Sequence, residues 1–225
     1  MGAAQRQGLA AAWYVSCIQL DSADHASVGR TEFASTPPCG AFAQPKATTM
    51  GSPTTTPEKI DELYELIDGM EVALMTTRRP DGLLVTRPMA TQDRGPLADL
   101  WFVTSIDTHK VDEIEADPHV SLGYYDHGSS EWVSVSGRAS ICQDRDKIHE
   151  LYEDDWKMWF PDDGPGRDGG PDDPRLALIF VEALTVTYMK AKHSKPMTLF
   201  EIAKGRLTGK QPDIGREEHL DRAEL

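Results

Sequence analysis

The residues best suited to bind a ligand lie in one stretch of the chain. It runs from a strand-like segment that reaches Arg87 to a short helical segment that carries Lys110. A guanidinium, an ammonium and nearby hydroxyls at the ends of strands suit a phosphate, because all of them donate hydrogen bonds to its oxygens. Met89, Trp101 and Phe102 lie beside these groups and suit a flat ring. Together the two sets predict a flavin mononucleotide (FMN) site.

The elements that would position these groups follow from turn residues and hydrophobic periodicity. An amphipathic helix begins at Thr56-Pro57-Glu58 and ends at Gly69, and the turn at 79–82 joins two strands in a hairpin. The predicted strands are 70–77, 83–90, 99–104, 120–125, 131–141 and 176–188. Three further helices are expected: one capped by Asp107 or Ser105, one that begins at Asp144, and one over 198–206.

This order of elements indicates a mainly β fold with helices (α+β). No regular crossover helices separate the strands, which argues against a doubly wound parallel sheet and favours a six-stranded antiparallel barrel with helices at its seams. Residues 1–55 are rich in Ala, Ser, Thr, Gly and Pro without a persistent apolar period, and we expect a disordered extension there. The barrel domain is expected over 56–190, and a tail with a short helix over 191–225.

The net charge and the cysteine content of the chain exclude some partners and favour one cellular location. The net charge is −14, and residues 1–55 contribute none of it, because three basic groups there balance three acidic ones. A domain this acidic repels nucleic acid and anionic membranes, so neither is an expected partner. Three scattered cysteines form neither a disulfide framework nor a zinc site, which favours a reducing, cytoplasmic location.

Other motifs in the sequence give little support for a dinucleotide site, a metal site or a catalytic serine. Residues 164–169 match the GxGxxG dinucleotide pattern, but they neither follow a strand nor open a helix, so we interpret them as a flexible surface loop. The seven histidines show no metal-binding spacing, and no metal site is predicted. Ser134 and Ser136 lack the glycines of a nucleophile elbow. No residue stands out as a catalytic acid or base.

The order and spacing of several short motifs resemble one family. They are Met75-Thr76-Thr77 with Asp81-Gly82, Arg87-Pro88-Met89, the run 100–104, Lys110, the run 117–120, the run 135–139, Trp159-Phe160-Pro161 and Asp173-Pro174. Over roughly residues 56–190 the chain is similar to the pyridoxamine 5'-phosphate oxidase-like, FMN-binding split-barrel superfamily, and within it to the bacterial general stress proteins. No basic substrate-binding signature follows Tyr188, which argues against vitamin B6 oxidation.

The resemblance implies a homodimer with two equivalent flavin sites at the subunit interface. Arg87 and Lys110 would hold the phosphate, and Thr104 and Ser105 would complete the cradle. The ring would be lined by Pro88, Met89, Ala90, Trp101, Phe102 and Val103. An aromatic residue of the partner, near Trp132 or Trp159, would close each pocket.

The function expected from this resemblance is that of an FMN-dependent oxidoreductase of the general stress protein type, acting on a small redox substrate. The first alternative is a stress protein that binds or sequesters flavin without turnover. Relatives on the same barrel bind a deazaflavin (F420) or haem instead, and no histidine here is clearly placed as an axial haem ligand. A dimer without any cofactor is the remaining alternative.

Overall fold

The computed structural model describes residues 57–92, 100–191, 195–209 and 215–225. The extension expected over 1–55 lies outside these ranges. The strands are β1 (Val72–Arg78), β2 (Leu84–Ala90), β3 (Leu100–Ser105), β4 (His119–Tyr125), β5 (Trp132–Cys142), β6 (Leu176–Ala191) and β7 (Gly215–Asp221). The helices are α2 (Pro57–Met70), α3 (His109–Ala116), α4 (Arg145–Leu151), the 3-10 helix η1 (Asp154–Trp159) and α5 (Lys195–Thr208). None of the helices described is long and apolar enough to cross a membrane.

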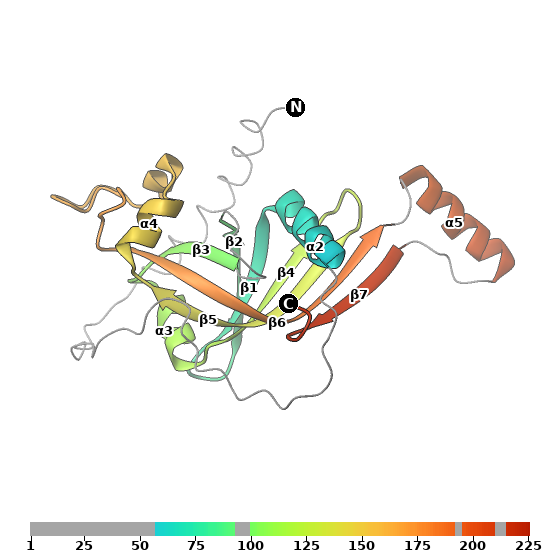
Figure 1. Cartoon of the computed structure of the whole chain (residues 1–225), viewed down its shortest axis with the longest axis horizontal. Helices are drawn as coiled ribbons and strands as arrows, with labels where there is room; N and C mark the ends of the chain where they lie inside the picture. The colour runs from blue at the N-terminus through green and yellow to red at the C-terminus, as the bar shows by residue number, and fades with distance from the viewer. Residues whose placement is uncertain (1–56, 93–99, 192–194, 210–214) are drawn as a thin grey trace.

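The strands form one antiparallel sheet that curls into an open barrel (Figure 1). Its order is β2-β1-β4-β5-β6-β3, and an isolated bridge between Thr91 and Phe102 brings the end of β2 next to β3. The two edge strands therefore approach each other at one point without pairing along their length. The prediction of a six-stranded antiparallel split barrel is confirmed, with strand ends that differ from the predicted ones by up to three residues.

A further strand, β7, pairs with β6 outside this path. Sequence reasoning missed it, because Gly215–Asp221 has charged residues at most positions and only Leu220 is buried. The terminal helix is also longer than predicted, and its residues Lys195–Thr208 connect β6 to β7.

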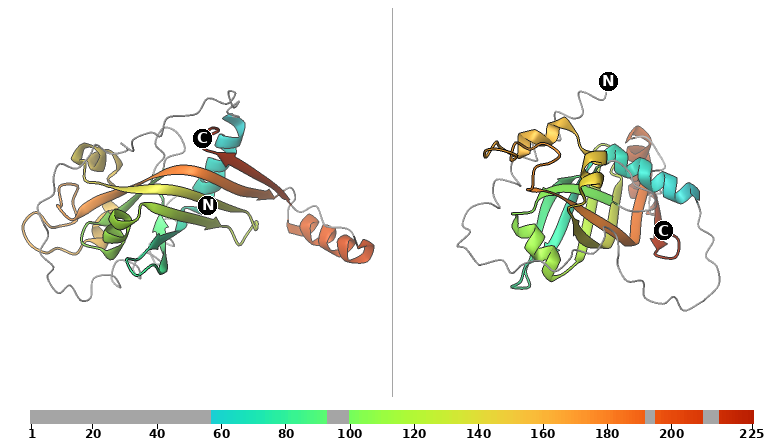
Figure 2. Two further views of the ribbon diagram at one scale, coloured as in Figure 1. Left: turned by 90° about the horizontal axis from the view of Figure 1, so that it is seen from below. Right: turned by 60° about the vertical axis from the view of Figure 1, so that its left-hand side comes forward.

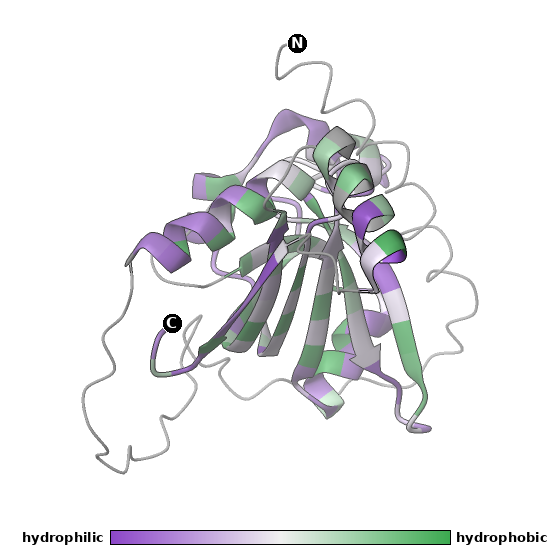
Figure 3. Cartoon of the chain, turned by 90° about the vertical axis from the view of Figure 1, so that its right-hand side faces the viewer, coloured by the Kyte–Doolittle hydropathy of each residue, from purple (hydrophilic) through white to green (hydrophobic). Residues whose placement is uncertain are grey.

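The barrel interior holds the main hydrophobic core. Alternation along the strands directs every second side chain inward, which produces the banding visible in Figure 3. Leu63, Tyr64 and Ile67 of α2 add the apolar face of that helix to this core. A second cluster lies on the other side of β3 and β6, where α4 and η1 pack; Trp101, Trp156 and Phe180 belong to it. Strand β3 is therefore buried on both faces.

Two helix ends differ from the predicted ones. Helix α2 continues through Gly69 to Met70, and Glu71 takes the left-handed conformation (φ 60°) that usually falls to glycine at this position. The N-cap of α3 is Thr108 rather than Asp107 or Ser105, and its hydroxyl makes no capping bond. The cap of α4 is as predicted, since Asp144 accepts hydrogen bonds from the backbone N–H of Asp146 and Lys147.

Candidate functional site

Arg87 lies on the face of β2 that also carries Met89, a residue of the main core. Arg87 is only 9% exposed, and its guanidinium donates hydrogen bonds to both carboxylate oxygens of Glu113, at 2.9 and 3.2 Å. It also donates to the hydroxyl of Thr77 on β1, at 3.0 Å, and this hydroxyl donates to Glu113 at 2.6 Å. Three elements, β1, β2 and α3, thus meet at one buried ionic group.

The carboxyl group of Glu113 is kept ionised by these contacts. Burial raises its pKa, but hydrogen bonds from Arg87 and Thr77 and the positive charge of Arg87 outweigh burial, so the net pKa is below the ordinary glutamate value. A buried charge pair of this kind fixes the orientation of the guanidinium.

A second polar group lies at the turn between β3 and α3. Lys110 is 1% exposed, and its ammonium donates to the hydroxyl of Thr104 at 3.4 Å. The hydroxyls of Thr104 and Thr108 are 3.3 Å apart, and that of Thr108 donates to the carbonyl of Ser105 at 2.9 Å. The hydroxyl of Ser105 accepts from the backbone N–H of Asp107 at 3.3 Å. The turn thus gathers three hydroxyls beside a buried ammonium.

The two groups are neighbours through α3. Lys110 and Glu113 are three residues apart on this helix, and residues at that spacing share one face. The helix packs against β1 and β5. The structure therefore brings Arg87, Lys110, Thr104 and Ser105 to one region of the barrel. Sequence reasoning missed Glu113, whose position one turn after Lys110 was the available signal.

The residues predicted to line a ring divide between the two faces of the strands. Met89 and Phe102 point into the main core and are 2% and 0% exposed. Trp101 and Val103 point to the second cluster, against which Ala90 also packs. Pro88 alternates with Arg87 and Met89 and so lies on the same face of β2 as Ala90. A flat ring contacts the side chains of one face only. Met89 and Phe102 pack in the main core, and their contact with the ring stays a prediction.

The two tryptophans proposed to close a partner's pocket lie in different places. Trp132 begins β5 and alternates with the core residue Val133, so it lies on the outer face of the sheet. Trp159 ends η1 and packs against the second cluster.

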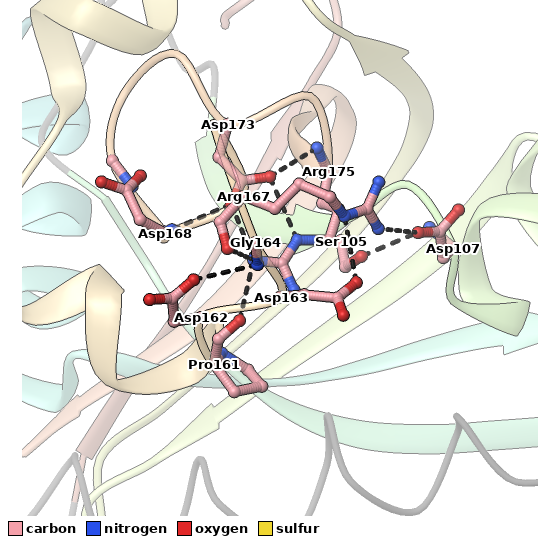
Figure 4. Close-up of polar contacts among 12 residues, drawn as sticks. Ser105, Asp107, Pro161, Asp162, Asp163, Gly164, Arg167, Asp168, Asp173 and Arg175 are labelled. Atoms are coloured by element: carbon pink, nitrogen blue, oxygen red, sulfur yellow. Dashed lines mark hydrogen bonds and ion pairs between the residues drawn. The ribbon is translucent and has the colours of Figure 1, made fainter.

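The loop that contains the GxGxxG pattern lies at the surface, as expected, since Gly164, Gly166 and Asp168 are exposed. The base of this loop is anchored by buried contacts. Arg175 forms an ion pair with Asp173 at 2.7 Å, and the Asp173 side chain is 0% exposed (Figure 4). The guanidinium of Arg175 also donates to the carbonyls of Pro161 and Arg167, at 3.0 and 2.8 Å. The backbone carbonyl of Arg175 accepts from the N–H of Ile106, which ties the loop to the turn that carries Ser105.

Comparisons with known proteins agree with this architecture. Residues 58–213 match the sequence profile of the family described as pyridoxamine 5'-phosphate oxidase like. Protein bli-3 of Neurospora crassa is 33% identical over 173 residues, which cover 75% of this chain and 82% of that protein. General stress protein 26 of Bacillus subtilis is 31% identical over 103 residues, which cover 44% of this chain and 68% of that protein.

A solved structure shows the same fold. The crystal structure described as a general stress protein 26 from Jannaschia sp. CCS1 is 22% identical, has a TM-score of 0.58, and aligns with 74% of this chain and 99% of that one. The open antiparallel sheet defines the molecule as a split β-barrel protein. The chain belongs to the pyridoxamine 5'-phosphate oxidase-like family, and its relatives include proteins named general stress protein 26.

Proposed function

We propose that this protein binds FMN as a homodimer and acts as a flavin-dependent oxidoreductase of the general stress protein type. The observation that carries the proposal is the gathering of Arg87 and Lys110, both buried, with the hydroxyls of Thr104 and Ser105 around one helix start. Family membership supports the same cofactor class.

The donor set fits a phosphomonoester. A guanidinium offers a planar fork, an ammonium offers a point charge, and both form charge-assisted hydrogen bonds with phosphate oxygens. In this proposal Arg87 and Lys110 bind the phosphate, and Thr104 and Ser105 donate from their hydroxyls. Glu113 positions Arg87 through its two hydrogen bonds.

The remaining residues would orient the ring and exclude water from it. In this proposal the ring contacts Pro88, Ala90, Trp101 and Val103, which lie on one side of β2 and β3; Trp101 and Val103 also pack within the second cluster. When bound, the flavin supplies hydride or electron transfer, and the protein supplies orientation and a dry environment. No side chain is assigned as a catalytic acid or base.

The outer face of the sheet supports the homodimer. Leu74 on β1 and Tyr125 on β4 are 51% and 59% exposed, and Tyr125 pairs directly with Trp132 across β4 and β5. Pro88 pairs with Leu74, so the apolar surface extends onto β2. Exposed apolar side chains on one face of a sheet favour burial by a partner. A second copy would cover this surface and bring Trp132 close to the partner's site.

Flavin titration of matched variants tests the phosphate assignment. Lys110→Met removes one charge-assisted hydrogen bond and should weaken FMN affinity by about 10- to 100-fold. Lys157→Met is the control, because Lys157 lies on η1 and its side chain is 51% exposed. Equal affinity of the Lys110 variant and the control would refute the cradle. Turnover of a reduced nicotinamide with common acceptors then separates an oxidoreductase from a flavin-sequestering protein.

A further inference from the structure

Gln92 follows the residues of β2 that would line the flavin ring. It comes two positions after Ala90, which comes two positions after Pro88, and alternate residues of an extended chain share one face. Its backbone N–H donates to the carbonyl of Trp101 at 2.8 Å, so it lies where the end of β2 meets β3. Helices α4 and η1 pack beside this junction, at the end of the molecule away from α5 (Figures 1 and 2). The side chain of Gln92 therefore continues the proposed ring surface.

The carboxamide of Gln92 is held in one orientation by two hydrogen bonds. Its Nε2 donates to the backbone carbonyl of Ala90 at 3.1 Å, and its Oε1 accepts from the indole N–H of Trp156 at 3.1 Å. An indole N–H can only donate and a carbonyl can only accept, so these partners determine which end of the carboxamide carries the oxygen. Trp156 is 3% exposed, and its ring packs edge-on against that of Tyr152 with centroids 5.4 Å apart. The side chain of Gln92 is thus preorganised.

A carboxamide held in this way still offers a donor and an acceptor. The group has two N–H donors and two acceptor lone pairs. Within the part of the chain that the structure describes, each end of the Gln92 carboxamide makes the single hydrogen bond given above. A donor beside an acceptor is complementary to an edge that presents an acceptor beside a donor. The imide edge of a flavin ring, with its N–H between two carbonyl groups, is such an edge.

The position of Gln92 suits the ring end of an FMN molecule whose phosphate lies at Arg87. The two residues are five positions apart, which is about 17 Å of extended chain. An extended FMN molecule, together with the two side chains that reach toward it, covers such a distance. Trp101 and Trp156 beside the carboxamide are 8% and 3% exposed. A hydrogen bond in such apolar surroundings is stronger than one in water, and a polar group left unpaired there is costly.

We propose that Gln92 binds the imide edge of the flavin ring and that Trp156 positions Gln92 for this contact. The inference rests on the proposed function and adds to it the residue that recognises the ring. A site that hydrogen-bonds an N–H of its ligand rejects an analogue that lacks this N–H, because its own polar group is then left unpaired. The contact therefore predicts a preference that the phosphate cradle alone does not provide.

The probe for this contact is 3-methyl-FMN, which carries a methyl group in place of the imide hydrogen and keeps the phosphate. Wild-type protein should bind FMN about tenfold more tightly than 3-methyl-FMN. Gln92→Met is close in size and removes both hydrogen-bonding groups, so it should weaken FMN binding and abolish the preference. Gln92→Glu retains an acceptor both for the imide N–H and for Trp156, so it should keep the preference although its FMN affinity falls. Titrations of the two flavins measure this.

Trp156→Phe tests the positioning role. It keeps an aromatic ring in the second cluster but removes the indole N–H, so the preference for FMN should fall by about threefold. Combined with Gln92→Met it should change the preference no further, since both residues act through one contact. Tyr152→Phe is the matched control, because it removes a hydrogen bond to the carbonyl of Gly169 from the same segment and should leave the preference as in the wild type.

The outcomes separate this inference from the phosphate cradle. Lys110→Met should weaken FMN and 3-methyl-FMN equally, since both carry the phosphate. Equal binding of the two flavins by the wild type, or a preference that survives in Gln92→Met, would overturn the contact and leave the cradle intact. A wild type that binds neither flavin would overturn both. The wild-type preference and the Trp156 variant decide the point even where Gln92→Met does not fold.

A role of Gln92 in binding the substrate gives a different result. In that case Gln92→Met raises the KM for a reduced nicotinamide and leaves the preference between the two flavins unchanged. This result would also overturn the assignment of Gln92 to the flavin ring.

Discussion

Arg87 and Glu113 are bound to each other in the barrel, with both carboxylate oxygens accepting from the guanidinium at 2.9 and 3.2 Å. The residue predicted to bind phosphate therefore has an anionic partner of its own, 26 positions along the chain. This pairing holds the guanidinium in one orientation and also places a negative charge beside the proposed phosphate.

Glu113→Gln separates these two effects. Removing one member of a buried ion pair costs about 3 kcal/mol, so the flavin-free protein should lose stability. The same change removes a negative charge next to the phosphate, so FMN should bind more tightly and raise the Tm of the variant more than that of the wild type. Thermal melts with and without FMN measure both, with Asp112→Asn on the exposed face of α3 as the control. An unchanged Tm of the flavin-free variant, together with weaker FMN binding, would contradict both the stabilising contribution of Glu113 and its repulsion of the phosphate.

The pair of Asp173 and Arg175 should make stability depend on acid pH. Burial raises the pKa of Asp173, but hydrogen bonds from Arg175 and from the backbone N–H of Gly169 outweigh burial and lower the pKa to about 2. Because the folded value lies below the ordinary 3.8, the stabilisation is complete above about pH 4 and is lost as pH falls toward 2.

The shift corresponds to about 2 kcal/mol of unfolding free energy. Urea unfolding between pH 7 and pH 3 should therefore show a steeper loss in the wild type than in the double variant Asp173→Asn/Arg175→Met. Parallel pH profiles for the two proteins would show that the pair does not contribute.

Gly137 should tolerate no larger residue. A Cβ atom at this position would lie 2.6 Å from the backbone carbonyl oxygen of Glu182, at the irregularity between β5 and β6. We expect Gly137→Ala to destabilise the protein by at least about 2 kcal/mol, because a backbone neighbour cannot move aside as a side chain can. Gly123→Ala on β4 is the matched control, since a Cβ there meets nothing within 4 Å. Equal chemical denaturation midpoints for the two variants would disprove the close contact.

The end of α2 offers two stabilising changes. Gly69 lies inside the helix with open space around it, whereas Glu71 has a φ of 60°. Gly69→Ala and Glu71→Gly should each raise stability by about 0.5 to 1 kcal/mol, because each residue then suits its backbone conformation. Thermal melting of the single variants checks both. A lower Tm for Glu71→Gly would mean that the left-handed position carries no strain.

The sequence was sufficient to predict the strands of the barrel, because alternation and turn residues such as Pro80 and Gly82 act locally. It was insufficient where the structure or the partner of a residue depends on a segment that is distant in the sequence. Strand β7 has little apolar pattern of its own and depends on β6 for pairing. The partner of Arg87 could not be read from its neighbours, since Glu113 comes from another element. The buried pair of Asp173 and Arg175 was hidden in a segment whose composition is that of a surface loop.

The most direct test of the central claim is the visible absorption spectrum of the protein purified without added cofactor, followed by release and identification of any chromophore. The proposed cradle predicts flavin absorption bands and the release of about one FMN per subunit, with the flavin lost from Arg87→Ala. A colourless protein that also fails to bind added FMN, or an Arg87→Ala variant that retains flavin as the wild type does, would contradict the account.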